Sequence, residues 1–123
     1  MCRGKVWLIN LDPTVGSEIR KTRPAIIVND DAIGILPLKA IVPITDWKEH
    51  YSIAPWMVRV KPDQMNGLQK LSAADALQVR SVSQERFIRK LGNLPVETMD
   101  AIGKSLAVVL SLSTGSVLLP VRN

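Results

Sequence analysis

Apolar residues along this chain gather in short runs separated by polar turns that contain Gly or Pro, a pattern typical of many short strands. Runs rich in β-branched, aromatic and aliphatic residues predict strands over 6–11, 25–28, 38–44, 56–60 and 88–91. The third of these runs is apolar at nearly every position, so it is predicted to be buried on both faces. The segment 68–79 fits either a pair of short strands or a partly helical stretch, because its periodicity does not distinguish them.

Polar segments mark where these strands end. The dipeptide Asp12-Pro13 ends the first strand, because proline has no N–H to donate to a ladder. Residues 14–22 show no periodicity and contain glycine, so they are predicted to form a loop. Ser83 is predicted to be the N-cap of a short helical turn over 84–87.

The last part of the chain changes from strand to helix periodicity. Pro95 suits the first turn of a helix, and apolar residues recur every three or four positions from 96 to 110. Gly115 is expected to end this helix, and the apolar tail 116–123 has no evident role. Many short strands followed by a terminal helix predict a small, mostly antiparallel barrel, with residues 1–123 forming one domain and 115–123 a short tail.

Composition narrows the classes of partner. Sixteen Lys and Arg against eleven Asp and Glu give the 123 residues a net charge of +5, which favours RNA, DNA or an acidic protein segment or else only maintains solubility. Cys2 is the only cysteine, so no disulfide can form within the chain, which fits a reducing cytosol. No apolar run is long enough to span a membrane, and the N-terminus lacks an apolar signal core. A cytoplasmic protein without a membrane anchor is therefore expected.

Several kinds of chemistry are excluded or disfavoured. His50 is the only histidine, and its polar surroundings predict a surface residue rather than the base of a nucleophilic triad. Ribonuclease chemistry that uses a pair of histidines is excluded, because the chain has only one. The acidic turn 29–31 has oxygen ligands for a hard cation, but a turn closing the second strand is the preferred interpretation. The sequence contains no phosphate-binding glycine loop or dinucleotide fingerprint, so no metal and no cofactor are expected.

What remains is a cationic site with a hydroxyl. Arg23 lies between the loop 14–22 and Pro24, and its planar guanidinium suits a phosphate. Thr45 follows the third predicted strand. If the second and third strands pair as a hairpin, both residues lie at the same end of it. The alternative is structural: Arg23 forms an ion pair with Glu18, and Thr45 caps a turn.

Three segments carry a family resemblance: RGKVWLINLDPTVGSEIRKTRPAIIV at 3–28, AIVPIT at 40–45, and LQVRSVSQERFIRKLG at 77–92 before the terminal helix. With them the chain resembles the MazF/PemK-like toxins of bacterial type II toxin–antitoxin systems over nearly its whole length. The resemblance implies an SH3-like barrel (CcdB/MazF-like) with a C-terminal helix and a homodimer. It also implies a metal-independent, sequence-specific endoribonuclease that cleaves single-stranded RNA. The implied partner is a cognate MazE-like antitoxin whose acidic segment folds across the RNA groove.

The resemblance also implies roles for individual residues. By position, Arg23 and Thr45 correspond to the catalytic arginine and threonine of the family. Glu18 lies in the family's mobile loop and is the candidate base. The charged loop and the family's Gln-x-Arg supply most of the expected RNA-binding residues, which are Ser17, Arg20, Lys21, Gln78 and Arg80. Independently of the resemblance, Trp47 beside the polar loop 48–54 is a candidate for base stacking, with packing in the fold as the alternative.

Two positions depart from the family pattern. Asp46 follows the threonine where many members have serine, which adds negative charge where a phosphate should approach. Leu77 stands where many members have an acidic residue, and Asp75 shares its side only if the segment is a strand. These departures keep open an inactive homologue that only binds RNA or antitoxin. A second alternative is a non-enzymatic, CcdB-like toxin that binds a protein target.

Overall fold

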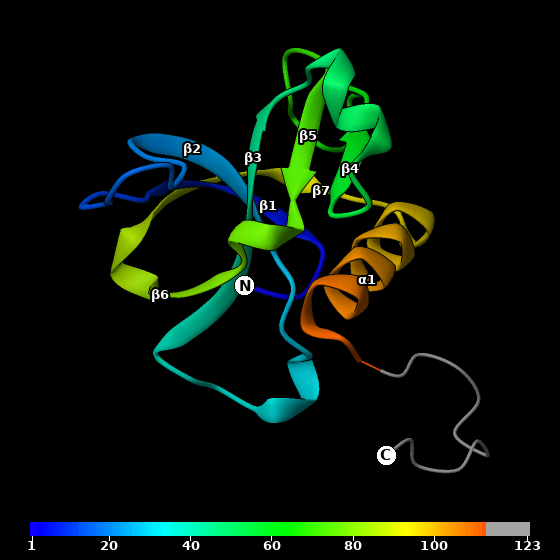
Figure 1. Ribbon diagram of the computed structural model, residues 1–123. Helices are drawn as coiled ribbons and strands as arrows, with labels where there is room; N and C mark the ends of the chain where they lie inside the picture. The colour runs from blue at the N-terminus through cyan, green and yellow to red at the C-terminus, as the bar shows by residue number, and fades with distance from the viewer. Residues whose placement is uncertain (113–123) are drawn as a thin grey trace, which may run out of the picture.

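The computed structural model describes residues 1–112 as an antiparallel sheet with one α-helix, α1 (Val96–Leu110) (Figure 1). Within these described residues, four short 3₁₀ helices connect strands: η1 (Asp31–Ile33), η2 (Glu49–Ile53), η3 (Ala76–Gln78) and η4 (Gln84–Arg86). The strands are β1 (Lys5–Asn10), β2 (Thr22–Ile27), β3 (Leu38–Asp46), β4 (Met57–Val60), β5 (Ser72–Asp75), β6 (Arg80–Ser83) and β7 (Phe87–Asn93).

All five predicted strands are present, with ends shifted by a few residues. The ambiguous segment 68–79 contains both types of structure, since β5 is followed directly by η3. The sequence did not predict β6, whose four residues have no apolar run. Ser83 is the predicted cap, because its hydroxyl accepts a hydrogen bond from the N–H of Glu85.

The end of α1 was predicted incorrectly. The helix ends at Leu110, and Ser111 adopts the left-handed conformation that closes it, with φ 55°. A left-handed C-terminal residue lets the last carbonyls accept hydrogen bonds from the chain that follows, and serine takes this role instead of Gly115. The tail 116–123 lies outside the described residues.

The seven strands form one sheet in the order β4-β5-β3-β2-β1-β7, with β6 paired to β3. The long strand β3 joins its two halves, because its first part pairs with β2 and β6 and its last part pairs with β5. The end strands β4 and β7 are not paired with each other, so the sheet stays open. The predicted fold class, mainly β with a C-terminal helix, is confirmed.

The core lies on both faces of the central strands. Val42 and Ile26 belong to the larger apolar cluster, which Met99 and Ile102 of α1 complete. Their chain neighbours Ile41 and Ile27 belong to a second cluster, against which Trp7 packs. Because side chains alternate across a strand, a continuous apolar run serves both clusters, as predicted for 38–44.

The segment 61–71 packs tightly against β7 and forms one wall of the site described below. The Asn66 side chain is buried, accepts from the N–H groups of Asp63 and Leu68, and donates to the carbonyl of Lys61. The N–H of Asn93 donates to the carbonyl of Met65 at 2.8 Å. These contacts fix the segment, because the buried amide of Asn66 has partners at both its oxygen and its nitrogen.

Candidate active site

A pocket opens where β3 leaves β2. The hydrogen-bonded ladder between β2 and β3 ends at the pair Ala25 and Pro43. If the same register continued for two more residues, Arg23 would lie opposite Thr45. Pro24 and Pro43 meet at this end, and neither has an N–H to donate, which explains why the ladder stops here. Thr45 pairs instead with a residue of β5, and the gap between the two strands becomes the pocket.

This Arg23 pocket has a volume of about 290 Å³ and contains both residues of the proposed catalytic pair. Arg23 and Thr45 are half-buried, so their polar groups are partly shielded and still accessible. Three of its lining side chains are cationic and one is anionic. The lining residues are Leu8, Arg23, Pro24, Ile44, Thr45, Asp46, Gly67, Leu68, Gln69, Lys70, Ser72, Arg89 and Leu91. The hairpin predicted from the sequence therefore brings the arginine and the threonine to one site.

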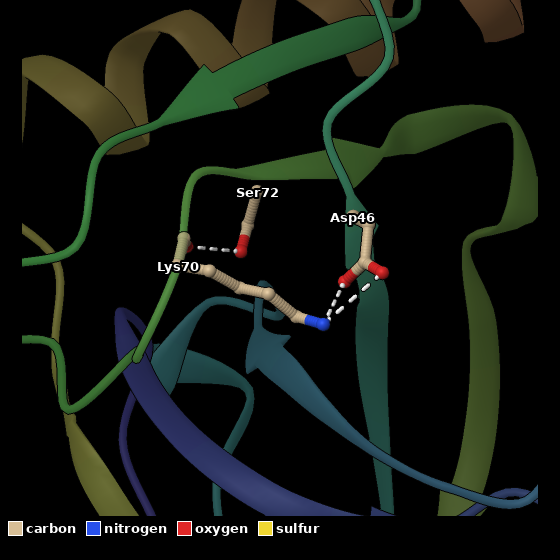
Figure 2. Close-up of polar contacts among 3 residues, drawn as sticks. All are labelled: Asp46, Lys70 and Ser72. Atoms are coloured by element: carbon tan, nitrogen blue, oxygen red, sulfur yellow. Dashed lines mark hydrogen bonds and ion pairs between the residues drawn. The ribbon is translucent and has the colours of Figure 1, made fainter.

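Asp46 does not stand alone in this pocket, since Lys70 is paired with it (Figure 2). The Lys70 Nζ lies 3.1 Å from Oδ1 and 3.2 Å from Oδ2 of Asp46. The hydroxyl of Ser72 donates to the carbonyl of Lys70 at 2.8 Å and fixes its backbone. The negative charge that departs from the family pattern is thereby neutralised within the site.

A second pocket, of about 320 Å³, contains three other predicted site residues, Glu18, Gln78 and Arg80. Gln78 holds the loop 14–22: its Oε1 accepts from the N–H of Ile19 at 2.6 Å, and its Nε2 donates to the carbonyl of Ser17 at 3.3 Å. In this structure the loop is therefore closed onto η3 rather than onto the Arg23 pocket.

Glu18 and Arg80 do not line the Arg23 pocket, and each is bonded elsewhere. The Glu18 carboxylate accepts from the N–H of Val15 at 2.5 Å. Arg80 donates from Nη1 to the carbonyl of Leu11 at 3.2 Å. The structure thus separates the candidate base from the proposed catalytic pair.

The remaining predicted RNA-binding residues lie outside both pockets. Arg20 and Lys21 are exposed on the loop. Trp47 is half-buried and makes an edge contact with the ring of Tyr51, with ring centroids 5.8 Å apart. The Arg59 guanidinium lies over the indole of Trp47, 5.8 Å from its centroid. That cation covers one face which a stacking base would use.

The structural alternative for the catalytic pair was wrong in both parts. Among residues 1–112 the single ion pair joins Lys70 and Asp46, so Arg23 and Glu18 are not paired. Thr45 lies within β3 and caps no turn. The sequence could not decide this, because a loop position does not specify which carboxylate an arginine meets.

The features expected to be unrelated to catalysis are explained by local structure. Asp30 caps η1 by accepting from the N–H of Ala32, and Asp31 accepts from the N–H of Arg3, so the acidic turn is structural. His50 is exposed, as predicted, and its ring contacts that of Tyr51.

Within the described residues, no three His, Cys, Asp or Glu side chains gather as metal ligands. None of the helices in this part of the chain is long and apolar enough to span a membrane.

Two cationic residues of the site were missed in the sequence. Lys70 and Arg89 line the Arg23 pocket, although neither belongs to the expected set. Arg89 is placed by β7, which pairs it with Leu8. The sequence signals were the basic run RFIRK at 86–90 and a lysine within the ambiguous segment 68–79. Neither indicated a place beside Arg23 without the tertiary structure.

The buried carboxyl of Asp75 gives a prediction on stability. Asp75 is 5% exposed, and burial raises its pKa above the ordinary value of 3.8, opposed by hydrogen bonds from Leu77 and Gln78. A raised pKa in the folded state stabilises the protein fully below pH 3.8, and this stabilisation is lost as pH rises through the folded-state pKa. Asp75→Asn removes this titration and keeps an acceptor for Leu77. The variant is therefore expected to gain stability relative to wild type as pH rises from 3 to 7.

Urea denaturation of both proteins at the two pH values measures this difference. The pH dependence is the decisive quantity, because any constant effect of the substitution cancels. A relative stability that falls between pH 3 and pH 7 would contradict the raised pKa.

The fold and the Arg23 pocket together define a small, mainly β domain whose site suits an anion. The model of the PemK-like, MazF-like toxins of type II toxin–antitoxin systems matches residues 2–110. The chain belongs to this family. The resemblance stated from its sequence motifs is thereby confirmed.

Curated relatives and solved structures agree with this assignment. The chain is 30% identical to "Endoribonuclease MazF9" of Mycobacterium tuberculosis over 118 residues, covering 91% of this chain and 98% of the relative. It is 29% identical to "Endoribonuclease PemK" of Escherichia coli over 113 residues, covering 90% and 83%. The crystal structure of MazF from Deinococcus radiodurans is 25% identical with a TM-score of 0.71, covering 89% and 94%. A mycobacterial endoribonuclease in complex with its cognate antitoxin shares the fold, with a TM-score of 0.73, 21% identity and coverage of 94% and 99%.

Proposed function

We propose that this protein is the toxin of a type II toxin–antitoxin pair and an endoribonuclease that cleaves single-stranded RNA without a metal ion. The family and the curated relatives named as endoribonucleases support the enzyme class. The observation that carries the mechanism is the Arg23 pocket, where a guanidinium and a hydroxyl lie at the same end of the β2–β3 hairpin. Both are hydrogen-bond donors, and a phosphodiester offers only acceptors to them.

In the proposed reaction the 2′-hydroxyl of the substrate attacks the adjacent phosphorus and loses its proton. The bond from phosphorus to the 5′-oxygen breaks, and that oxygen takes up a proton. The products are a 2′,3′-cyclic phosphate and a 5′-hydroxyl. Because the nucleophile belongs to ribose, DNA of the same sequence is not a substrate.

Within this reaction Arg23 stabilises the charge on the pentavalent phosphate and supplies a proton toward the leaving oxygen. It does not act as the base, since a protonated guanidinium has only N–H donors and no lone pair to accept a proton. Thr45 donates its hydroxyl to a phosphate oxygen. Both groups come from strands of the sheet, which favours precise placement.

Glu18 is the proposed base, and this role requires movement of the loop. Its carboxylate must leave the N–H of Val15, and the loop must leave Gln78, before it can reach the Arg23 pocket. Glu18 is the only carboxylate in the loop 14–22. The RNA-binding roles of Ser17, Arg20, Lys21, Trp47, Gln78 and Arg80 belong to the same proposal, with the loop opened over the bound strand.

The antitoxin and a second copy of the chain are the proposed protein partners. The net charge of +5 favours an acidic antitoxin segment, and the excess of cations in the Arg23 pocket suits the same segment as it suits RNA. The mycobacterial relative of known structure is described in complex with its cognate antitoxin. We extend this arrangement to the present chain, together with the homodimer that its family resemblance implies.

Incubation of the purified protein with a long single-stranded RNA in EDTA tests this function. We expect cuts at a recurring short sequence, with a 2′,3′-cyclic phosphate on one product and a 5′-hydroxyl on the other. A DNA strand of the same sequence is expected to stay intact. End mapping by sequencing and by sensitivity to polynucleotide kinase identifies both products.

Other results would contradict the proposal. Cleavage only after addition of a divalent metal would contradict the proposed metal independence, and a 5′-phosphate on the product would contradict attack by the 2′-hydroxyl. Binding of RNA without any cut would favour the inactive homologue, while neither binding nor cleavage would favour a CcdB-like toxin with a protein target.

A further inference from the structure

The Arg23 pocket contains more cationic groups than the proposed catalytic pair uses. Arg23, Lys70 and Arg89 line it, and Asp46 is the only carboxylate among its lining residues in the described part of the chain. Asp46 adjoins Thr45 in β3, so the Lys70 ammonium that binds it lies beside the proposed phosphate site. Lys70 therefore shares a pocket with the proposed site of the reacting phosphate, within reach of that phosphate or of the next one along the RNA.

Lys70 combines a fixed backbone with an accessible charged end. Ser72 donates to its carbonyl, and the carbonyl of Leu71 accepts from the N–H of Trp47 at 3.1 Å. The packed segment 61–71 precedes it. The Lys70 side chain is nevertheless 68% exposed and that of Asp46 is 51% exposed. The base of the side chain is therefore anchored while its ammonium can change partners.

The bond between these two side chains is of a kind that is readily exchanged. An ion pair this exposed contributes little to stability, because water and salt compete with both charges. The two carboxylate oxygens hold Nζ at 3.1 and 3.2 Å, much as two oxygens of a phosphate would. A phosphate entering the pocket can therefore replace Asp46 at Lys70 at low energetic cost.

Resting on the proposed function, we infer that Lys70 is an RNA-phosphate-binding residue of this toxin. Before RNA binds, the Lys70 ammonium is paired with the Asp46 carboxylate, and an RNA phosphate then replaces that carboxylate. Asp46 then weakens RNA binding, because each binding event must break the pair and leave the carboxylate near the new phosphate. This assigns a function to the charge that departs from the family pattern. Lys70 binds the substrate and takes no part in bond cleavage.

The test measures binding of a short fluorescent single-stranded RNA of mixed sequence, 2′-O-methylated throughout so that it cannot be cleaved. We expect Lys70→Gln to weaken binding about tenfold at low salt and to reduce the slope of log K against log salt by about 0.7. Lys70→Arg is expected to restore most of the affinity. Lys104→Gln is the matched control, because Lys104 is exposed on α1 and lines no pocket described here, and its affinity should equal that of wild type.

Asp46→Asn tests the second part of the inference. It should tighten binding about threefold in the wild-type background, and by clearly less when Lys70 is already replaced by glutamine. An equal increase in RNA affinity in both backgrounds would mean that Asp46 acts only by repelling phosphate. That result would overturn the inference that phosphate replaces Asp46 at Lys70. Unchanged affinity and salt slope in Lys70→Gln would overturn the assignment of Lys70.

Cleavage kinetics separate this inference from the proposed function. With cleavable RNA in EDTA, Lys70→Gln should raise KM and change kcat little, as expected for a binding residue. If wild type cleaves and Lys70→Gln matches it in both constants, only the role of Lys70 fails. If wild type does not cleave, the proposed function fails, and the binding measurements still decide whether Lys70 contacts RNA phosphate.

Discussion

Arg23→Ala is expected to lower the rate of RNA cleavage by about a hundredfold or more, the usual effect of removing one donor that is preorganised for a developing charge. Arg23 lines the pocket with Thr45 and belongs to no ion pair among the described residues. Its removal therefore leaves no buried carboxylate without a partner. The fold and the midpoint of urea denaturation should change little. Single-turnover cleavage of the mapped RNA sequence measures the rate.

Two control variants make this test specific. Arg23→Lys keeps the charge but loses the planar fork of donors, so it should recover only a small part of the activity. Lys104→Ala removes a cation from the exposed side of α1 and should leave cleavage unchanged. An Arg23→Ala protein that is folded and cleaves at the wild-type rate would refute the role proposed for Arg23.

Gly92→Ala is expected to destabilise the folded protein by about 3 kcal/mol or more, because the added methyl group has no space. A Cβ at Gly92 would lie 2.1 Å from the carbonyl oxygen of Met65 and 2.7 Å from the carbonyl carbon of Asn66. Both are backbone atoms of the packed segment 61–71, so relief requires movement of that segment. Urea denaturation measures the loss in the free energy of unfolding. Since the segment also carries Lys70, the variant should lose RNA affinity as well.

Gly103→Ala is the matched control for this substitution. Gly103 lies in α1, and the nearest atom to its added Cβ is a guanidinium nitrogen of Arg3 at 3.8 Å, an ordinary contact. Alanine should stabilise the helix by about 0.5–1 kcal/mol relative to glycine. A Gly92→Ala protein as stable as Gly103→Ala would show that β7 and the segment 61–71 are not packed closely at Gly92.

The strands that carry the proposed catalytic pair were predictable because local chemistry defines them. Prolines next to short β-branched runs specify where β2 and β3 lie, and the register of the hairpin then brings Arg23 and Thr45 together. By contrast, β6 has a polar, weakly patterned sequence and exists because β3 offers it a partner. A strand specified by its neighbour rather than by its own residues leaves little trace in the sequence.

Several site residues depend on contacts between segments far apart in the chain. Gln78 is bonded to the loop 14–22, about sixty residues before it, and Lys70 is bonded to Asp46. Residue type and spacing do not specify such partners, because an exposed polar side chain can bond with many others. For this reason the sequence placed Glu18 with Arg23, whereas the structure holds its carboxylate on the N–H of Val15.

The sequence by itself determined the family, the mainly β fold with a terminal helix, and the two strands that place Arg23 and Thr45 in one pocket. Each of these follows from local patterns of apolar residues, prolines and motif residues that act within one strand or one hairpin. Only the tertiary structure decided that Lys70 neutralises Asp46, that Arg89 completes the cationic pocket, and that the loop is held by Gln78. Each of those features joins segments far apart in the chain, so each depends on the packing of the whole domain.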